Sequence, residues 1–378
     1  MLKIIENFFQ NNFVKPAKTI AVAVSGGADS LALTFLLHEF CIKNKIKLHA
    51  VTIDHKMRKA SSKEALQLHK ILLENKITHQ VLTIPSKNIP QKNIEANLRE
   101  ERYKLLYNFC IQNKIEHLFL GHQIGDAAEN FIIRLFRGSQ IDGLSAMQEI
   151  VQFNKIKLCR PFINTAKDEL KQYLQSKKQK WFEDETNDDE KFLRNKIRKF
   201  FEQFEEKNLI QKRIQTAAQN IFETKELLDD ILLREASNCL AFESEGNFLI
   251  DIEKYKKIPP KIAQKILSLV LIEISGKDYK PRFEGLKNFE ANILNLKKGQ
   301  KKNFYGCMAK HAPQGSGIDK KNKITKILIY KEKLTQKPLK SLKQEISTQK
   351  PIPKKSIANA DKPSSKFNFR TILGKIFS

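Results

Sequence analysis

The densest group of residues able to do chemistry is the run Ser-Gly-Gly-Ala-Asp-Ser at residues 25–30. An apolar run, AVAV, precedes it, and a helical spacing of apolar residues follows it directly. Two adjacent glycines let the backbone turn tightly and approach an anion without an obstructing Cβ. Loop N–H groups and the positive end of a helix then bind phosphate. We therefore predict a phosphate-binding loop made of Ser25, Gly26, Gly27, Ala28, Asp29 and Ser30.

Asp29 is the unexpected member of this loop, because a carboxylate repels phosphate. Mg²⁺ resolves the conflict, since it bridges carboxylate and phosphate oxygens. The full motif resembles the pyrophosphate loop (PP-loop) of the N-type ATP pyrophosphatases, which cleave ATP between its α and β phosphates. The lysine of a GxxxxGK[ST] loop is absent, and its absence favours cleavage between the α and β phosphates over transfer of the γ-phosphate. The resemblance implies ATP and Mg²⁺ as cofactors, with Asp29 as a metal ligand.

Three further stretches carry charged residues at strand ends or at helical spacing. Asp54 follows the second predicted strand, where the adenine or ribose of a nucleotide would lie. Arg99 and Arg102 are three residues apart, and Arg194 and Arg198 are four apart, so each pair shares a helical face. Guanidinium groups bind phosphates through two parallel hydrogen bonds. We predict that both pairs contact phosphates.

The stretch HLFLGHQIGDAAENFIIRLFRGSQIDGLSAM, residues 117–147, completes the pattern. It reads as a strand, then His122 and Asp126, then a helix that carries Arg134 and Arg137. Together with DETNDDEKFLRNKIRKF at residues 184–200, these stretches resemble the tRNA(Ile)-lysidine synthetases. The resemblance is close over residues 18–200 and weaker as far as residue 330. It does not cover the last 44 residues or so.

The resemblance implies an ATP-dependent reaction on the isoleucine tRNA that carries a CAU anticodon. ATP would adenylate the C2 oxygen of the wobble cytidine, and the ε-amine of free L-lysine would then displace AMP to give lysidine. An amine with a pKa near 10.4 must lose its proton before it attacks, so a carboxylate must accept that proton.

Asp126, Asp29 and His122 are the implied catalytic residues. Asp126 is the candidate base, with Mg²⁺ coordination beside Asp29 as its competing role. The implied contacts to ATP or tRNA phosphates are Arg99, Arg102, Arg134, Arg137, Arg194 and Arg198. The chain departs from the family pattern at Gly125 and Ala127, where an Asp and a Gln are usual, so the arrangement of metal and base stays open.

The elements that must position these residues alternate between strand and helix over residues 18–121. The predicted strands cover residues 18–24, 48–53, 80–84 and 117–121, with helices over 29–43, 61–75 and 94–113 between them. This order predicts an α/β fold: a parallel, doubly wound, Rossmann-like sheet of the adenine nucleotide alpha hydrolase type. Ligands of such sheets bind at the carboxyl ends of the strands, at the switch point.

Beyond residue 200 the pattern becomes mostly helical with short strands. We predict helices over 201–236, 260–274 and 282–296, a hairpin over 241–252, and strands over 304–309 and 326–330. Residues 335–378 hold nine Lys and one Arg against two acids. This composition predicts a disordered basic tail. The predicted organisation is a catalytic domain over 1–204, a tRNA-binding domain over 205–334 and the tail.

Composition narrows the class of protein further. The chain of 378 residues has 68 basic and 42 acidic side chains, a net charge of +26. This charge favours a polyanionic partner, although a Lys-rich surface of an A+T-rich genome would read the same way. No apolar run reaches the roughly 18 residues of a membrane span, and the N-terminus lacks a signal-peptide pattern. We expect a cytoplasmic protein; its oligomeric state is not predicted.

Two rival functions stay open from the sequence. One is another PP-loop enzyme that modifies tRNA, such as a thiolase, which would need reactive cysteines. The five cysteines lie far apart in the sequence and include no CxxC pair. The other is a tRNA-binding relative without activity, which the changes at Gly125 and Ala127 would favour.

Overall fold

The computed structural model describes residues 1–13, 17–55, 59–85, 94–145, 147–183, 193–243, 246–277, 279–312 and 326–332. The chain divides into two compact units, Met1–Lys225 and Glu226–Ser378. The division falls inside the 33-residue helix α9 (Lys207–Cys239), whereas the sequence predicts a boundary just before this helix begins. The predicted tail at 335–378 lies outside the described residues.

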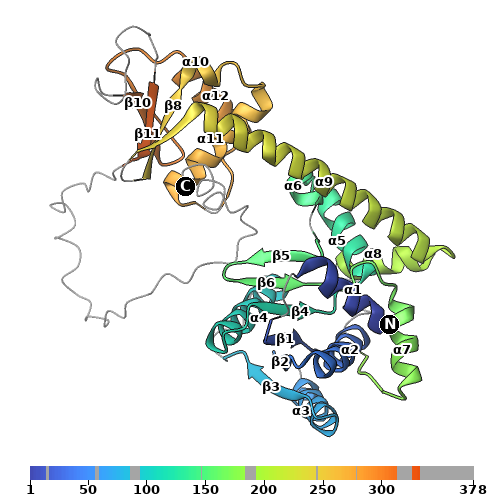
Figure 1. The fold of residues 1–378 in the computed structure, drawn as a ribbon. Helices are drawn as coiled ribbons and strands as arrows, with labels where there is room; N and C mark the ends of the chain where they lie inside the picture. Colours follow the sequence, from blue (N-terminus) through green and yellow to red (C-terminus); the bar gives the residue numbers. More distant parts are fainter. Residues whose placement is uncertain are drawn as a thin grey trace, which may run out of the picture. The chain divides into compact units, whose positions relative to one another are not determined.

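A six-stranded sheet of order β3-β2-β1-β4-β6-β5 forms the centre of the first unit (Figure 1). The first four strands along the chain are parallel, as predicted, and β6 is parallel to β4. Only the edge strand β5 is antiparallel to its neighbour. The strands are β1 (Thr19–Ala23), β2 (Lys47–Asp54), β3 (Thr78–Thr83), β4 (His117–Leu120), β5 (Ile150–Phe153) and β6 (Ile156–Cys159).

The β5–β6 hairpin was not predicted from the sequence. Each strand has only four residues, too few for alternation to stand out, and the turn between them depends on Asn154 adopting a φ of 52°. Asparagine tolerates this left-handed conformation better than most residues do. The hairpin extends the sheet beyond β4 and so places Arg160, directly after β6, at the carboxyl edge of the sheet.

Helices cover both faces of this sheet. The buried side chains of α1 (Leu2–Asn12), α2 (Ala28–Asn44), α3 (Lys59–Glu74) and α7 (Lys167–Ser176) share one core with Ile20 and Val22 of β1. Residues of α4 (Ile94–Gln112) form a separate core with Ala21 and with inward residues of β4 and β6. Because successive β1 side chains point to opposite faces, two cores on one strand define a doubly wound sheet.

Helices α5, α6 and α8 carry or support several of the predicted site residues. The N-terminus of α5 (Ile124–Phe136) stands beside the sheet, and α6 (Ile141–Leu144) follows it after a short turn. Helix α8 (Leu193–Glu202) packs against α5, where Ala128, Ile197 and Phe201 form a small buried cluster. Packing of this cluster holds α8 so that its arginines, Arg194 and Arg198, face the carboxylates of α5.

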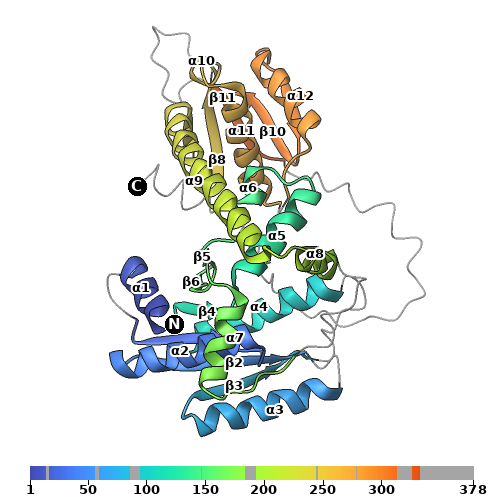
Figure 2. The same ribbon diagram turned by 90° about the vertical axis from the view of Figure 1, so that its right-hand side faces the viewer.

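The second unit contains the helices predicted over 260–274 and 282–296, and its short strands join in an antiparallel sheet of order β7-β8-β11-β10-β9 (Figure 2). The prediction of one helix over 201–236 is wrong, because residues 203–206 interrupt it between α8 and α9. Its helices are the end of α9, α10 (Ile252–Tyr255), α11 (Pro260–Ser275) and α12 (Phe283–Leu294). The predicted strand at 304–309 is wrong at its start, because Tyr305 and Gly306 adopt positive φ values and form a turn. The strands are β7 (Leu240–Glu243), β8 (Asn247–Asp251), β9 (Lys301–Phe304), β10 (Cys307–His311) and β11 (Lys326–Lys331).

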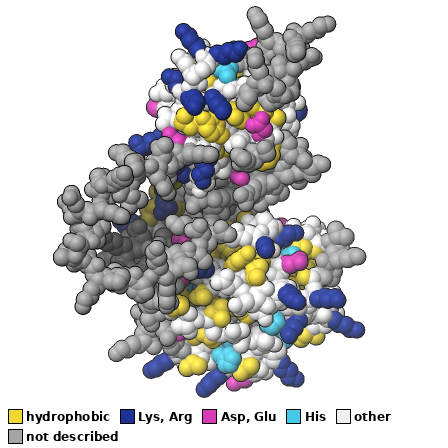
Figure 3. All heavy atoms as spheres, turned by 90° about the vertical axis from the view of Figure 1, so that its left-hand side faces the viewer, with side chains coloured by type: hydrophobic (Ala, Val, Ile, Leu, Met, Phe, Trp, Pro, Cys, Tyr) yellow, Lys and Arg dark blue, Asp and Glu magenta, His cyan; other side chains and the backbone are white. Residues whose placement is uncertain are grey.

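The described surface is rich in cationic side chains. Lys and Arg side chains, dark blue in Figure 3, occur on the visible surface of both units. Among the helices within the described ranges, none has the length and apolar character needed to cross a bilayer.

Candidate functional site

The predicted phosphate loop connects the end of β1 to the start of α2, at the point where the sheet order reverses. Gly26 has a φ of 87°, which favours glycine, and Gly27 caps the helix. The Ser25 N–H donates to Ser30 Oγ over 3.1 Å, and Ser30 Oγ donates to the Gly27 carbonyl over the same distance. The loop is therefore closed by its own serines, with Ser25 exposed.

Two residues that were not predicted as site residues, Gly121 and Phe182, pack closely against the loop. A Cβ on Gly121, directly after β4, would lie 2.9 Å from backbone atoms of Ser30. The Phe182 N–H donates to the Gly26 carbonyl over 3.0 Å, and its ring lies where a Cβ on Gly26 would point. The strand beside β1 and the segment before α8 thus both touch the loop. The only sequence signal for Gly121 was a glycine at the end of the strand predicted over residues 117–121.

Asp29 and Asp126 form an electrostatically coupled pair of carboxylates beside the loop. Burial raises the pKa of Asp29 to about 7, and the charge of Asp126 adds to this shift. Burial also raises the pKa of Asp126, with Glu129 adding to the effect and Arg194 opposing it. Asp29 Oδ1 is buried and has no hydrogen-bond partner among the described residues. A cation would satisfy this atom and remove the repulsion, so the two carboxylates fit Mg²⁺.

Glu129 binds both arginines of α8. Its carboxylate is 4% exposed and lies 2.9 Å from the Nε atoms of Arg194 and Arg198. A guanidinium nitrogen of Arg194 also lies 3.6 Å from Asp126 Oδ1. The side chains of Arg194 and Arg198 are 27% and 28% exposed, so part of each guanidinium still faces outward. In the sequence Glu129 stood out only as a member of the motif at residues 117–147. In the structure it is the carboxylate that holds both Arg194 and Arg198.

His122 lies within a group of guanidiniums. Arg160 Nε donates to His122 Nδ1 over 3.1 Å, which leaves the ring proton on Nε2. Burial, together with the charges of Arg160 and Arg102, lowers the pKa of His122 well below its ordinary value, so the ring is neutral. Arg160 is 7% exposed and also donates to the Gln148 carbonyl. Arg160 was not among the predicted site residues, because the strand before it was not predicted.

Arg99 and Arg102 belong to the same cationic group. Each guanidinium carbon lies 5.3 Å from the ring centre of buried Tyr103 on α4. Burial opposes ionisation of the Tyr103 hydroxyl, but Arg102 and Arg99 outweigh it and lower its pKa. Such a concentration of positive charge around a neutral histidine is unfavourable until an anion binds it. The geometry therefore supports a phosphate group as its ligand.

The other predicted residues have contacts of their own. Arg134 donates to the Gly143 carbonyl over 2.9 Å, and burial and the nearby charge of Arg99 lower its pKa, so it lies close to the cationic group. Arg137 caps the C-terminus of α5 and is exposed. Asp54 is buried at the end of β2, the strand that pairs with β1. Residues 184–192, the first part of the DETNDDEKFLRNKIRKF stretch, lie outside the described residues.

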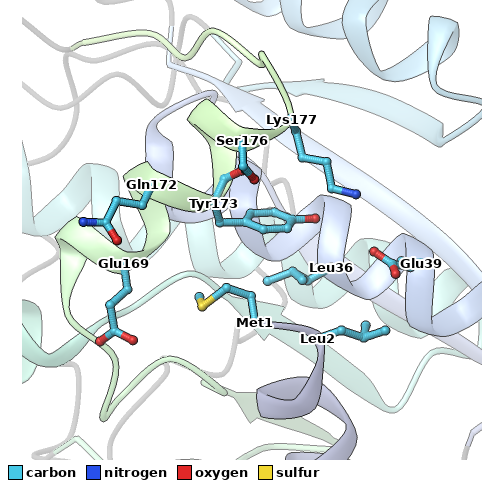
Figure 4. Close-up of a pocket in the computed structure, with 9 residues that line it drawn as sticks. All are labelled: Met1, Leu2, Leu36, Glu39, Glu169, Gln172, Tyr173, Ser176 and Lys177. Carbon is cyan, nitrogen blue, oxygen red and sulfur yellow. The ribbon is translucent and has the colours of Figure 1, made fainter.

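A pocket of about 530 Å³ lies elsewhere in the first unit, between α1, α2 and α7 (Figure 4). Its charged side chains are Glu39, Glu169 and Lys177, and the ring of Tyr173 lies at its centre. Two carboxylates against one lysine would repel a triphosphate. This pocket is therefore not the nucleotide site.

Comparison with known proteins agrees with the loop and the sheet. Residues 2–204 match the family model described as the PP-loop domain, so this part of the chain is a PP-loop domain. A tRNA(Ile)-lysidine synthase of Orientia tsutsugamushi (strain Boryong) is 31% identical over 302 residues, which cover 78% of this chain and 68% of the relative. One of Rickettsia prowazekii (strain Madrid E) is 34% identical over 299 residues, covering 77% and 67%. The chain belongs to the tRNA(Ile)-lysidine synthase family.

The match to these relatives spans about two thirds of their length. Among solved structures, the U34-tRNA thiolase NcsA from Methanococcus maripaludis matches with a TM-score of 0.50 at 17% identity. The match covers 59% of this chain and 77% of the thiolase. At this level of identity the likeness concerns the fold alone.

Proposed function

We propose that this protein uses ATP to join free L-lysine to C2 of the wobble cytidine in the CAU-anticodon isoleucine tRNA. The products are lysidine in the tRNA, AMP and diphosphate, and the reaction takes place in the cytoplasm. The observation that supports this most is the cluster of Asp126, Glu129, Arg194 and Arg198 beside a complete PP-loop, in a chain of the lysidine synthase family.

The first step is adenylation of the tRNA. The N–H groups after β1 and the N-terminus of α2 hold the ATP phosphates. The C2 oxygen of the cytidine attacks the α-phosphorus, the bond to the β-phosphate oxygen breaks, and diphosphate leaves. His122 Nε2–H and the guanidiniums of Arg99 and Arg102 bind a phosphate of ATP or tRNA through charge-assisted hydrogen bonds.

The second step replaces the adenylated oxygen by nitrogen. The ε-amine of lysine attacks C2, the C2–O bond breaks, and AMP leaves with that oxygen. The Asp126 carboxylate accepts the proton that the amine loses. Its raised pKa makes it a better proton acceptor than an ordinary aspartate.

Asp29 and Asp126 would hold Mg²⁺ at the same place. The ion would neutralise the charge of the phosphates and of the leaving diphosphate. Asp29 then serves the metal alone, because it lies in the phosphate loop. Asp126 serves the metal, the amine or both.

The cysteines argue against the thiolase alternative. All five are buried and free. Burial raises the pKa of each thiol to about 12. None of them would carry a thiolate at neutral pH, which sulfur transfer and iron–sulfur ligation need.

The direct test is incubation of the purified protein with ATP, Mg²⁺, labelled lysine and the CAU-anticodon isoleucine tRNA. We expect label in the tRNA and one AMP released for each lysine incorporated. A methionine tRNA with the same anticodon is the specificity control and should stay unlabelled. Tight tRNA binding without any label in the tRNA would support the rival function, a relative without activity.

A further inference from the structure

Two histidines lie behind the nucleotide loop and take no part in the proposed chemistry. His69 of α3 and His79 of β3 approach each other through their Nδ1 atoms, 3.0 Å apart. His79 Nε2 lies 2.8 Å from the hydroxyl of Thr52 on β2, and this hydroxyl lies 2.8 Å from the Val24 carbonyl. Val24 is the residue directly before the loop. Thr52 is 5% exposed and His79 8%, so the two contacts of the Thr52 hydroxyl are shielded from water.

The donor and acceptor in each of these hydrogen bonds follow from the chemistry of the groups involved. The Val24 carbonyl can only accept, so the single hydroxyl hydrogen of Thr52 points to it. Thr52 Oγ1 must then accept from His79, which places a proton on His79 Nε2. Burial, with the charge of His69 adding to it, lowers the pKa of His79 to about 4. His79 is therefore neutral at pH 7, and His69 Nδ1–H donates to His79 Nδ1.

The series of hydrogen bonds continues into the loop through the peptide bond between Val24 and Ser25. The carbonyl of Val24 and the N–H of Ser25 belong to one planar peptide unit. That N–H donates to Ser30 Oγ, whose own hydrogen goes to the Gly27 carbonyl. Because this uses the only hydrogen of Ser30, Ser25 is the donor in the contact between the two hydroxyls. Ser25, the exposed member, can turn its hydrogen to a phosphate oxygen, whereas Ser30 holds the loop.

We propose that Thr52, oriented by His79 and His69, is a positioning residue for the nucleotide loop: it fixes the peptide unit that precedes Ser25 and so presents the loop to the ATP phosphates. Hydrogen bonds aligned in one direction polarise and strengthen one another. A loop held in its binding conformation before ATP arrives binds more tightly, because less ordering is left to occur on binding. This inference rests on the proposed use of ATP.

The test is ATP affinity measured by titration calorimetry with Mg²⁺ on full-length variants. Thr52→Val keeps the shape and removes the hydroxyl, and we expect about tenfold weaker ATP binding, the size of one net hydrogen bond. Thr52→Ser keeps the hydroxyl and should bind as the wild type does. His79→Leu should weaken binding, whereas His79→Gln, which keeps an N–H near the position of Nε2, should restore most of it. Affinity for tRNA should not change in any of them.

A purely structural role would lower thermal stability without separating ATP from tRNA affinity. Nitrogen-15 NMR of the histidines in the wild type gives an independent result, since it reports directly which ring nitrogen of His79 carries the proton. Wild-type ATP affinity in Thr52→Val, or a proton on His79 Nδ1 at pH 7, would overturn this inference alone. A wild-type protein that binds no ATP would overturn the proposed function as well.

Discussion

Glu129 and Arg198 are joined by two hydrogen bonds, one from Nε to Oε1 over 2.9 Å and one from a terminal guanidinium nitrogen to Oε2 over 3.3 Å. The two residues are 69 positions apart in the sequence and lie on α5 and α8. This contact ties the helix that carries Arg194 and Arg198 to the helix that carries Asp126. The site residues of the two helices therefore depend on one buried carboxylate.

Glu129→Gln should reduce lysidine formation at least a hundredfold. The amide cannot pair with two guanidiniums, so Arg194 and Arg198 lose their common anchor and carry uncompensated charge. Partial exposure of both arginines limits the stability loss to about 2 kcal/mol. Steady-state kinetics and chemical unfolding measure the two effects. Glu74→Gln, on the exposed end of α3, is the matched control and should change neither; an active Glu129→Gln enzyme would show that the arginines need no anchor.

Arg194→Lys and Arg198→Lys should both lose activity, although they keep the charge. A lysine offers a single ammonium in place of the planar fork, so it loses the paired hydrogen bonds that a guanidinium makes to a carboxylate or a phosphate. We expect each variant to fall by more than tenfold in kcat/KM for tRNA or ATP. Turnover at the wild-type rate in both variants would mean that Arg194 and Arg198 take no part in the reaction.

Gly121→Ala and Gly27→Ala should differ in their effect on thermal stability, although both should weaken ATP binding. A Cβ at position 121 would lie 2.9 Å from the backbone of Ser30, so the loop must shift, at a cost of about 1–3 kcal/mol. At position 27 the nearest contact would be an ordinary 3.7 Å to the Ser25 hydroxyl. Gly121→Ala should therefore lower both thermal stability and ATP affinity, and Gly27→Ala only ATP affinity. Equal thermal stability of the two variants would contradict the close approach.

The parallel sheet and the phosphate loop could be predicted because their signals are local. The run AVAVSGGADS shows a strand, a turn and a helix start within ten residues. The role of Glu129 is different in kind, since its partners are 65 and 69 positions away. No spacing rule reports such a contact. Arg160 was missed for a related reason: the four-residue strand before it is stabilised by pairing with β4 and β5, not by its own pattern.

His79 should make the protein sensitive to mild acid. Its pKa in the folded chain is lowered to about 4 by burial and by His69, from an ordinary 6.5. The unfolded chain therefore binds a proton more readily, and stability present above pH 6.5 is lost as the pH falls toward 4. Between pH 7.5 and 4.5 the loss from this residue should be about 2 kcal/mol. His79→Gln cannot titrate, so its unfolding free energy should fall less over the same range; parallel pH curves for the two proteins would refute the assignment.

Asp126→Asn should abolish lysidine formation and leave tRNA affinity nearly unchanged. The substitution keeps the shape and the bond from the Gln123 N–H, but it removes the charge that faces Asp29 and Arg194. A separate measurement would test the coupling: without Asp126, the pKa of Asp29 should fall below about 7, because one of its two raising causes is gone. An active Asp126→Asn enzyme would move the base to another carboxylate.

Gly125→Asp tests whether a second carboxylate at the position usual in the family adds to Asp126. The Gly125 N–H donates to the Gln123 side chain, and a Cβ at position 125 would lie 2.9 Å from Gln123 Nε2 and 3.3 Å from Gln211 Nε2. Both neighbours are the ends of flexible side chains, so they can move at modest cost. We expect a folded, active enzyme with slightly lower thermal stability. In the double variant Gly125→Asp with Asp126→Asn, recovery of activity would show that the two positions are interchangeable metal ligands, and no recovery would assign Asp126 as the base.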